Sequence, residues 1–176
     1  HGDGILIVKG DATSCRDQND ADAYITNRKQ VPIAIRTADC VPVFIYDAAK
    51  KVIGLAHAGW KGTHQEIAKK TILAMQEHYD CRWHDLWVYL GPAIHACCYK
   101  VGHEFKAYFP QDVIDNDDGT ISVDIIQANL RQIRQLGLNP LQISDSGECT
   151  CCNRNYFSFR RDKEGAGRMI SLMMLL

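Results

Sequence analysis

A thiol and an imidazole in the stretch Arg36–Gly62 have the chemistry of a nucleophilic or metal-binding pair. Cys40 directly precedes the apolar run Val41–Tyr46. His57 directly follows the apolar run Val52–Ala56, and a short turn joins the two runs. Such a pattern is typical of a β-hairpin, in which the start of one strand lies beside the end of the other. We therefore expect Cys40 and His57 to be neighbours in the fold.

The chemistry of this pair has three interpretations. Cys40 and His57 could be a buried cysteine and a hydrogen-bonded histidine of an ordinary core. They could be a thiolate–imidazolium nucleophile, as in cysteine hydrolases. They could also be two ligands of a zinc ion, because zinc binds both thiolate and imidazole. A catalytic zinc takes three protein ligands and keeps a fourth position open, and spacing alone does not identify the third ligand.

Polar groups lie on both sides of the pair. Asp39 directly precedes Cys40. It could orient His57 as a hydrogen-bond partner of a metal ligand, or it could simply cap the end of a strand. Arg36 lies a little further upstream. The turn Gly59–Gly62, with the sequence GWKG, could form the floor of a substrate site or be an ordinary turn packed by its aromatic ring.

Composition restricts the class of protein. The chain has 176 residues, 46% of them hydrophobic, with a formal net charge of −1, which fits one globular domain over residues 1–176. A charge so near zero argues against a dedicated nucleic-acid binder. No apolar run is long enough to cross a membrane, and no signal peptide is visible. Because the chain starts at His1 without a methionine, we expect part of the domain to precede it.

The eight cysteines indicate a compartment and raise a second question. The chain is longer than the small secreted domains that depend on disulfides, so we expect mostly free thiols and a cytoplasmic location. The vicinal pair Cys97-Cys98 could be a metal or redox pair or two structural thiols. Cys149, Cys151 and Cys152 resemble half of a zinc finger, but no second C-x-x-C has suitable spacing, which favours a structural or incidental role.

Short strands alternate with a few helices, which predicts a mixed α/β or α+β fold. Apolar residues at helical spacing predict helices over Thr63–His78, His103–Phe109 and Val123–Leu136. Thr63 and Glu66 have the spacing of a capping box at the start of the first helix. Besides the hairpin, strands are predicted over Gly4–Lys9, Ala23–Thr26, Pro32–Arg36, Leu86–Leu90, Leu141–Ser144, Tyr156–Arg160 and Arg168–Leu176.

Six separated blocks give the chain a family resemblance. They read HG at 1–2, RTADC at 36–40, HAGWKG at 57–62, GPAI and CCYKVG within 91–102, CT at 149–150, and FSFRRD followed by GRM at 157–169. In this order they closely resemble the YfiH-like family, first described as multicopper polyphenol oxidases or "laccases" and now associated with purine nucleosides. Two positions depart from the family pattern, since Lys61 stands where arginine is more frequent and Cys151 where tyrosine is common.

The resemblance implies a fold, a cofactor and an activity. The fold is a layered α/β/β/α domain with mixed sheets. The implied activities are phosphorolysis of adenosine, inosine and methylthioadenosine and deamination of adenosine, in a zinc-dependent enzyme. Carried over block by block, the zinc ligands are His1, Cys40 and His57, with copper as a less favoured metal.

The implied chemistry is compatible with the residues of the chain. A zinc-bound water of lowered pKa could attack C6 of adenine. Phosphorolysis needs cationic side chains that hold phosphate beside the ribose, and the candidates are Arg36, Lys61, Arg160 and Arg161. Cys40, His57, Asp39 and Arg36 then form the expected catalytic group, and the expected partners are a purine nucleoside and phosphate, with no nucleic acid or membrane.

Three other functions compete with this interpretation. A cysteine hydrolase or deamidase would use Cys40 as nucleophile and His57 as base, without a metal. A copper oxidase of phenols would need paired histidines of the His-x-His type, which this sequence does not contain. A non-catalytic binding module would contact its partner through the polar stretch Gly10–Ala21.

Overall fold

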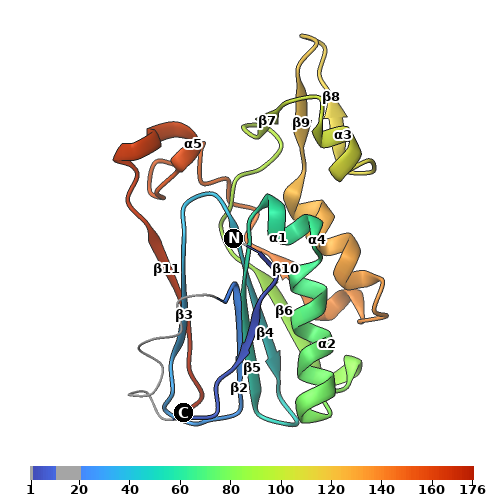
Figure 1. Cartoon of the computed structure of the whole chain (residues 1–176), viewed down its shortest axis with the longest axis vertical. Helices are drawn as coiled ribbons and strands as arrows, with labels where there is room; N and C mark the ends of the chain where they lie inside the picture. The colour runs from blue at the N-terminus through green and yellow to red at the C-terminus, as the bar shows by residue number, and fades with distance from the viewer. Residues whose placement is uncertain (1, 11–20) are drawn as a thin grey trace.

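The computed structural model of the chain describes residues 2–10 and 21–176. Its centre is a six-stranded sheet (Figure 1) with the order β1 (Ile5–Ile7), β2 (Ala23–Thr26), β5 (Val52–Ala58), β4 (Val41–Asp47), β6 (Leu86–Leu90) and β10 (Ile143–Asp145). The edge strands β1 and β10 run parallel to their neighbours, and the other pairs are antiparallel. The sheet is therefore mixed. The predicted hairpin forms its middle, because β4 and β5 are apolar along almost their whole length.

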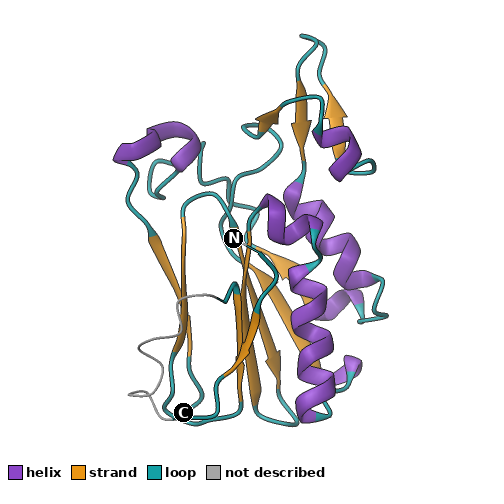
Figure 2. Ribbon diagram, viewed as in Figure 1, coloured by secondary structure: helices purple, strands orange, loops and turns teal. Residues whose placement is uncertain are grey.

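Helices cover one face of this sheet (Figure 2). They are α1 (Trp60–His64), α2 (Ile67–Tyr79) and α4 (Ile125–Arg134). Helix α2 packs its buried residues Ile67, Ile72 and Met75 on β5 and β2. The approach is close at Gly54 of β5, where an added Cβ would lie 2.8 Å from the sulfur of Met75. A larger residue at Gly54 would force the helix away from the sheet.

A two-stranded ribbon covers the other face. Strand β3 (Ile33–Thr37) pairs antiparallel with β11 (Met169–Met173). Residues of β3 alternate between buried and exposed, and Ile33 and Ile35 pack with Ile53 and Leu55 of β5 in a second apolar cluster. The order of these layers is thus helix, sheet and sheet, which confirms the mixed α/β class.

Smaller elements gather at one end of the molecule (Figure 1). Strands β7 (Lys100–Val101), β9 (Ile121–Val123) and β8 (Val113–Asp115) form a separate antiparallel sheet that carries the short helix α3 (Phe105–Tyr108). Helix α5 (Phe159–Asp162) lies at the same end. The described residues also form 3₁₀ turns at Trp83–Asp85, Pro140–Gln142 and Lys163–Gly165. None of the helices in the described residues is long and apolar enough to span a bilayer.

The predicted helix start at Thr63 is wrong. The chain forms α1 first, then turns through Glu66 in a left-handed conformation (φ 60°), and α2 begins at Ile67. Thr63 is fully buried, and its hydroxyl lies 3.4 Å from the carbonyl of Ala58 and accepts a hydrogen bond from Asn129. A long-range partner therefore uses the side chain that the capping box would have needed.

The strand predicted over Tyr156–Arg160 is also wrong. The hydroxyl of Ser158 accepts a hydrogen bond from the backbone N–H of Arg161 and caps helix α5. Because Ser158 is fully buried and acts as an N-cap, the residues after it turn into a helix and do not extend. The other predicted strands and helices are present, with ends shifted by a few residues.

Candidate functional site

The hairpin brings Cys40 and His57 together as the sequence predicts. Pro42 of β4 lies opposite His57 of β5, so Cys40 stands just beyond the end of that register. A Cβ built on Gly59 would lie 3.0 Å from Cys40 Sγ and 3.9 Å from His57 Nε2. The sulfur and the ring nitrogen therefore face the same small space, and Gly59 keeps that space open because it has no side chain.

Burial keeps both groups of this pair neutral. Loss of solvent raises the pKa of the Cys40 thiol to about 11, and the negative charge of Asp39 adds to the effect. Burial also lowers the pKa of the His57 imidazole, partly offset by the charge of Asp22. At neutral pH the protein alone therefore has a thiol beside an uncharged imidazole. A bound cation would ionise the thiol, because a coordinating thiol is deprotonated.

Asp22 is a site residue that the sequence analysis missed. Its backbone carbonyl accepts a hydrogen bond of 2.7 Å from the backbone N–H of His57. Its carboxylate accepts a hydrogen bond from the backbone N–H of Gly2. Asp22 thus ties the start of the chain to the end of β5, a pairing between distant segments that spacing in the sequence does not indicate.

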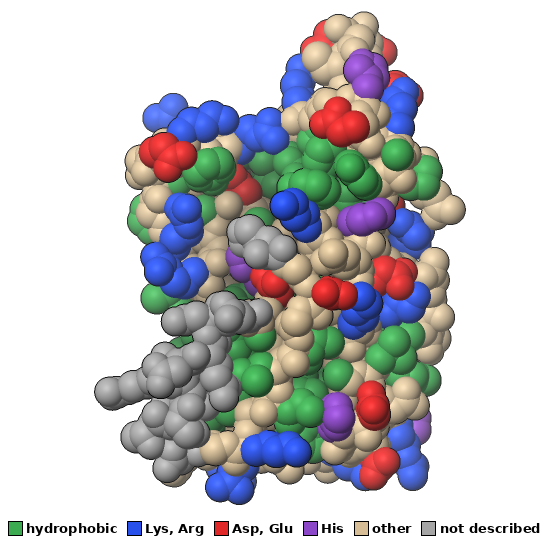
Figure 3. All heavy atoms as spheres, in the orientation of Figure 1, with side chains coloured by type: hydrophobic (Ala, Val, Ile, Leu, Met, Phe, Trp, Pro, Cys, Tyr) green, Lys and Arg blue, Asp and Glu red, His purple; other side chains and the backbone are tan. Residues whose placement is uncertain are grey.

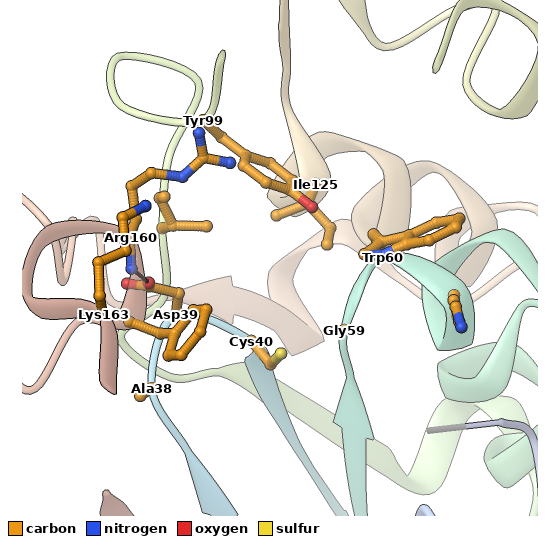
Figure 4. Close-up of a pocket in the computed structure, with 12 residues that line it drawn as sticks. Ala38, Asp39, Cys40, Gly59, Trp60, Tyr99, Ile125, Arg160 and Lys163 are labelled. Carbon is orange, nitrogen blue, oxygen red and sulfur yellow. Dashed lines mark hydrogen bonds between the residues drawn. The ribbon is translucent and has the colours of Figure 1, made fainter. Parts of the chain in front are cut away.

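The Cys40 side of the pair lines a cavity (Figure 4) with a volume of about 610 Å³, and His57 lies just behind Gly59. The size of the cavity is within the range of small-molecule sites. Cys40 and Asp39 lie at one side, and Trp60 and Tyr99 lie opposite them, so that the thiol faces aromatic rings across the space. The other side chains that line it are Ala38, Gly59, Lys61, Ile94, Ile125, Phe159, Arg160 and Lys163.

Asp39 joins the hairpin to the C-terminal part of the chain. Its carboxylate accepts a hydrogen bond of 2.7 Å from the hydroxyl of Thr150 and one of 2.6 Å from the backbone N–H of Arg160. Asp39 is only 8% exposed and has a φ of 85°, a conformation that costs energy for a residue other than glycine. These two hydrogen bonds hold the strained residue in place beside Cys40.

Three cations surround the cavity, two of them predicted. The Arg160 guanidinium lies 5.2 Å from the centre of the Tyr99 ring and donates to the carbonyl of Lys100 at 2.7 Å. The ammonium of Lys61 lies 5.6 Å from the centre of the Trp60 ring. Lys163 was missed, since it follows a short helix that the sequence did not indicate. On the surface (Figure 3), hydrophobic side chains show between blue Lys and Arg groups in the region between α5 and α3.

The structure places two predicted phosphate ligands outside this cavity. Arg36 is exposed on β3 and lines a separate shallow depression with Ala166, Gly167 and Arg168. Arg161 donates to the backbone carbonyls of Thr150, Cys151 and Tyr156 and pairs with Asp162. Arg161 thus holds the loop that precedes α5. The predicted ligand His1 lies outside the described residues.

Four cysteines form a cluster that the sequence analysis did not assemble. The sulfurs of Cys97, Cys98, Cys149 and Cys152 all lie within 4.8 Å of one another and could hold a metal ion. The vicinal pair Cys97-Cys98 supplies the partner that the C-x-x-C at 149–152 lacked in the sequence. This grouping favours a structural role for these thiols over an incidental one. Burial disfavours the Cys149 thiolate, but backbone N–H groups of His95, Cys152 and Cys151 stabilise it and lower its pKa to about 7. The signal was present in the sequence as two cysteine pairs after predicted strands.

Comparisons with known proteins show the family to which the chain is related. A family model described as multi-copper polyphenol oxidoreductase laccase matches residues 1–176. A protein of Clostridium acetobutylicum named purine nucleoside phosphorylase is 35% identical over 99% of this chain and 73% of its own length. One of the same name from Aquifex aeolicus is 34% identical over 89% of this chain and 72% of its own length.

Solved structures have the same fold. The hypothetical protein YfiH of Bacillus licheniformis matches with a TM-score of 0.90 at 32% identity, over 100% of this chain and 72% of that one. YlmD of Geobacillus stearothermophilus matches with a TM-score of 0.89 at 30% identity, over 99% of this chain and 70% of that one.

Proposed function

Because this chain belongs to the multi-copper polyphenol oxidoreductase laccase family, which is that of YfiH and YlmD, we propose that it is a zinc-dependent enzyme of purine nucleosides. Its reactions would be phosphorolysis of adenosine, inosine and methylthioadenosine and deamination of adenosine. The names of its relatives support the phosphorolytic part, since both the Clostridium and Aquifex proteins are named purine nucleoside phosphorylases. All seven cysteines among the described residues are free thiols, which suits a cytoplasmic enzyme.

One observation carries the proposal. The cavity beside the Cys40 thiol combines aromatic walls with positively charged side chains. A purine is a flat aromatic base that stacks on rings such as those of Trp60 and Tyr99. A phosphate anion would be attracted by Lys61, Arg160 and Lys163, with lysine acting as a point charge and arginine as a planar fork.

The chain's own residues fit a zinc ion at the base of this cavity. Cys40 Sγ and His57 Nε2 face one space, and a thiolate with an imidazole suits zinc. A Cβ on Gly62 would lie 3.2 Å from the carbonyl oxygen of Gly2 and 3.3 Å from that of His57, so the residue after His1 runs beside the end of β5. This position supports His1 as third ligand. Zinc held there would supply a Lewis acid and a water of lowered pKa.

In phosphorolysis the residues of the cavity would orient the two reactants. Trp60 and Tyr99 hold the base between them, while Lys61 and Arg160 hold phosphate beside C1′ of the ribose. An oxygen of hydrogen phosphate then bonds to C1′ as the bond from C1′ to the purine nitrogen breaks. The proton of hydrogen phosphate passes to the purine, which leaves as the free base, and the sugar is released as ribose 1-phosphate. In deamination, water adds at C6 and ammonia leaves, so that reaction does not use the phosphate site. Asp39 would position Cys40 and the Arg160 backbone through its hydrogen bonds to Thr150 and Arg160.

The cysteine hydrolase is the second candidate, because the thiol and the imidazole are neighbours. A thiolate–imidazolium pair needs a lowered thiol pKa and a raised imidazole pKa. The pKa of Cys40 is raised and that of His57 is lowered, each mainly by burial. These directions favour a metal-binding role for the pair over a metal-free nucleophile.

Product analysis tests the proposal. Zinc-loaded protein is incubated with adenosine, with and without phosphate, beside the variants Cys40→Ala and Cys151→Ala. Adenine formed only with phosphate identifies a phosphorylase, and inosine formed without phosphate identifies a deaminase. We expect Cys40→Ala to abolish both products and Cys151→Ala, which removes a thiol outside the cavity, to keep them. No product from the parent, or full activity in Cys40→Ala, would refute the purine proposal.

A further inference from the structure

The four-cysteine cluster has the dimensions of a single metal centre. The Cys97 sulfur lies 3.8 Å from that of Cys98, 3.7 Å from that of Cys149 and 3.6 Å from that of Cys152, and the sulfurs of Cys98 and Cys152 are 3.3 Å apart. Four sulfurs placed tetrahedrally about 2.3 Å from a zinc ion are about 3.8 Å from one another. The observed spacing is close to that value and much longer than the roughly 2.05 Å of a disulfide bond.

Backbone hydrogen bonds bring the two cysteine loops together next to the cluster. Ala93 pairs with Cys149 in an isolated β-bridge. The backbone N–H of Thr150 donates to the carbonyl of Ala93 at 3.0 Å, and that of Ala93 donates to the carbonyl of Glu148 at 3.2 Å. The sulfurs therefore approach one another on a framework that the fold itself provides, so a metal would find its ligands already grouped.

We propose that Cys97, Cys98, Cys149 and Cys152 bind a structural Zn²⁺ ion, separate from the site at Cys40 and His57. Four thiolates around one ion leave no open position for substrate, as in structural zinc sites. Soft thiolate ligands in a tetrahedral arrangement select zinc or iron among the common metals. The spacing C-x-x-C at 149–152 is usual for structural zinc, whereas the vicinal pair is unusual and depends on the sharp turn after His95.

The surroundings of the cluster suit such an ion. Arg161, whose guanidinium also pairs with Asp162, donates to the carbonyls of Thr150 and Cys151 and so holds the loop that carries Cys149 and Cys152. Cys97 and Cys152 are exposed, so an ion can reach the sulfurs from solvent.

The ion would hold a wall of the cavity in place. Tyr99 directly follows the ligand Cys98 and lines the cavity. Thr150 lies between the ligands Cys149 and Cys152, is fully buried and donates its hydroxyl hydrogen to Asp39. The zinc would cross-link the loop of Tyr99 to the loop of Thr150, and through Asp39 it would stabilise the backbone beside Cys40.

Metal analysis of the reduced protein tests this proposal without relying on enzymatic activity. The zinc content per chain is measured by inductively coupled plasma mass spectrometry for the parent, for Cys149→Ser/Cys152→Ser and for Cys40→Ala. We expect the double variant to contain one zinc fewer than the parent, and Cys40→Ala to keep the zinc of the cluster. The comparison works even if the purine proposal fails, because each variant reports on its own site.

Two further variants guard against misfolding. Cys152→His keeps a zinc-binding side chain at an exposed position, and we expect it to retain the ion that the double variant loses. Cys151→Ser changes a neighbouring cysteine outside the group of four and should keep full metal content. Cobalt added to metal-depleted Cys40→Ala, which lacks the other proposed metal site, should give the visible bands and thiolate charge-transfer absorption of a tetrahedral four-sulfur site. These bands should disappear when Cys149→Ser/Cys152→Ser is added to Cys40→Ala.

Several results would overturn the proposal. Equal zinc content in the parent and in Cys149→Ser/Cys152→Ser would exclude a zinc ion at the cluster. Disulfides among the four cysteines in protein prepared without oxygen would show that they are a redox group instead. Iron in place of zinc, visible as colour in the purified protein, would contradict the choice of metal.

Discussion

A methyl group added at Gly59 should damage the site without damaging the fold. The backbone of Gly59 has φ −71° and ψ 176°, which alanine adopts without strain. Its new Cβ would lie 3.0 Å from Cys40 Sγ, whereas non-bonded heavy atoms prefer separations of about 3.5 to 4.0 Å. Either the sulfur or the turn must therefore move by roughly half an ångström or more. For Gly59→Ala we expect a small net change in the free energy of unfolding, because the gain of about 0.4 to 1 kcal/mol from the less flexible unfolded chain offsets the cost of this displacement.

The effect on activity should be much larger. Misplacing a reacting group by about 1 Å costs roughly a hundredfold in rate. We therefore expect Gly59→Ala to lose about ten- to a hundredfold in kcat/KM for adenosine, equivalent to about 1.4 to 2.7 kcal/mol. The assay pairs steady-state kinetics with thermal unfolding. The matched control is Gly165→Ala, because a Cβ at Gly165 meets nothing within 4 Å. If Gly59→Ala were as active as Gly165→Ala, the space between Cys40 and His57 would not be the reacting centre.

Three other perturbations test separate parts of the site. Lys61→Gln and Arg160→Gln should each raise the KM for phosphate about tenfold, because each variant loses a hydrogen bond to a charged group. Deamination, which needs no phosphate, should be unchanged. Equal losses in both reactions would contradict a phosphate role. Thr150→Val should lower the free energy of unfolding by about 1 to 3 kcal/mol in urea titrations, because it leaves a carboxylate oxygen of the buried Asp39 unsatisfied. In metal-depleted protein, alkylation of Cys40 by iodoacetamide should be slow at pH 7, since only the thiolate reacts. The rate should increase as the pH rises toward the pKa of the Cys40 thiol, about 11. Fast alkylation at pH 7 would favour the cysteine hydrolase.

Local patterns in the sequence predict the elements that depend on local chemistry. The strands Ala23–Thr26 and Leu86–Leu90 have the predicted bounds, and the hairpin agrees to within two residues. These segments are apolar, β-branched or aromatic runs that end in turn residues, so nearby sequence determines their structure. The proximity of Cys40 and His57 follows from the same hairpin.

The missed features depend on contacts between distant segments. Thr63 fails as a helix cap because Asn129, far away in the sequence, uses its hydroxyl. Lys163 and Asp22 reach the site only through the packing of the C-terminal and N-terminal segments on the hairpin. The cysteine cluster likewise needs the bridge between Ala93 and Cys149. The periodicity of apolar residues in the sequence does not indicate such contacts between distant segments.

Asp39 links the hairpin site at Cys40 to the loop that carries Cys149 and Cys152, two segments that lie far apart in the sequence. Its left-handed backbone is strained, and strain of this kind persists only where surrounding contacts determine it. Those contacts are the hydroxyl of Thr150, inside the cysteine loop, and the backbone N–H of Arg160, at the cavity. Cys40 directly follows the strained residue, so the direction of its thiol depends on both. Loosening the cysteine loop would therefore change the hairpin site although no cysteine of the cluster lines the cavity.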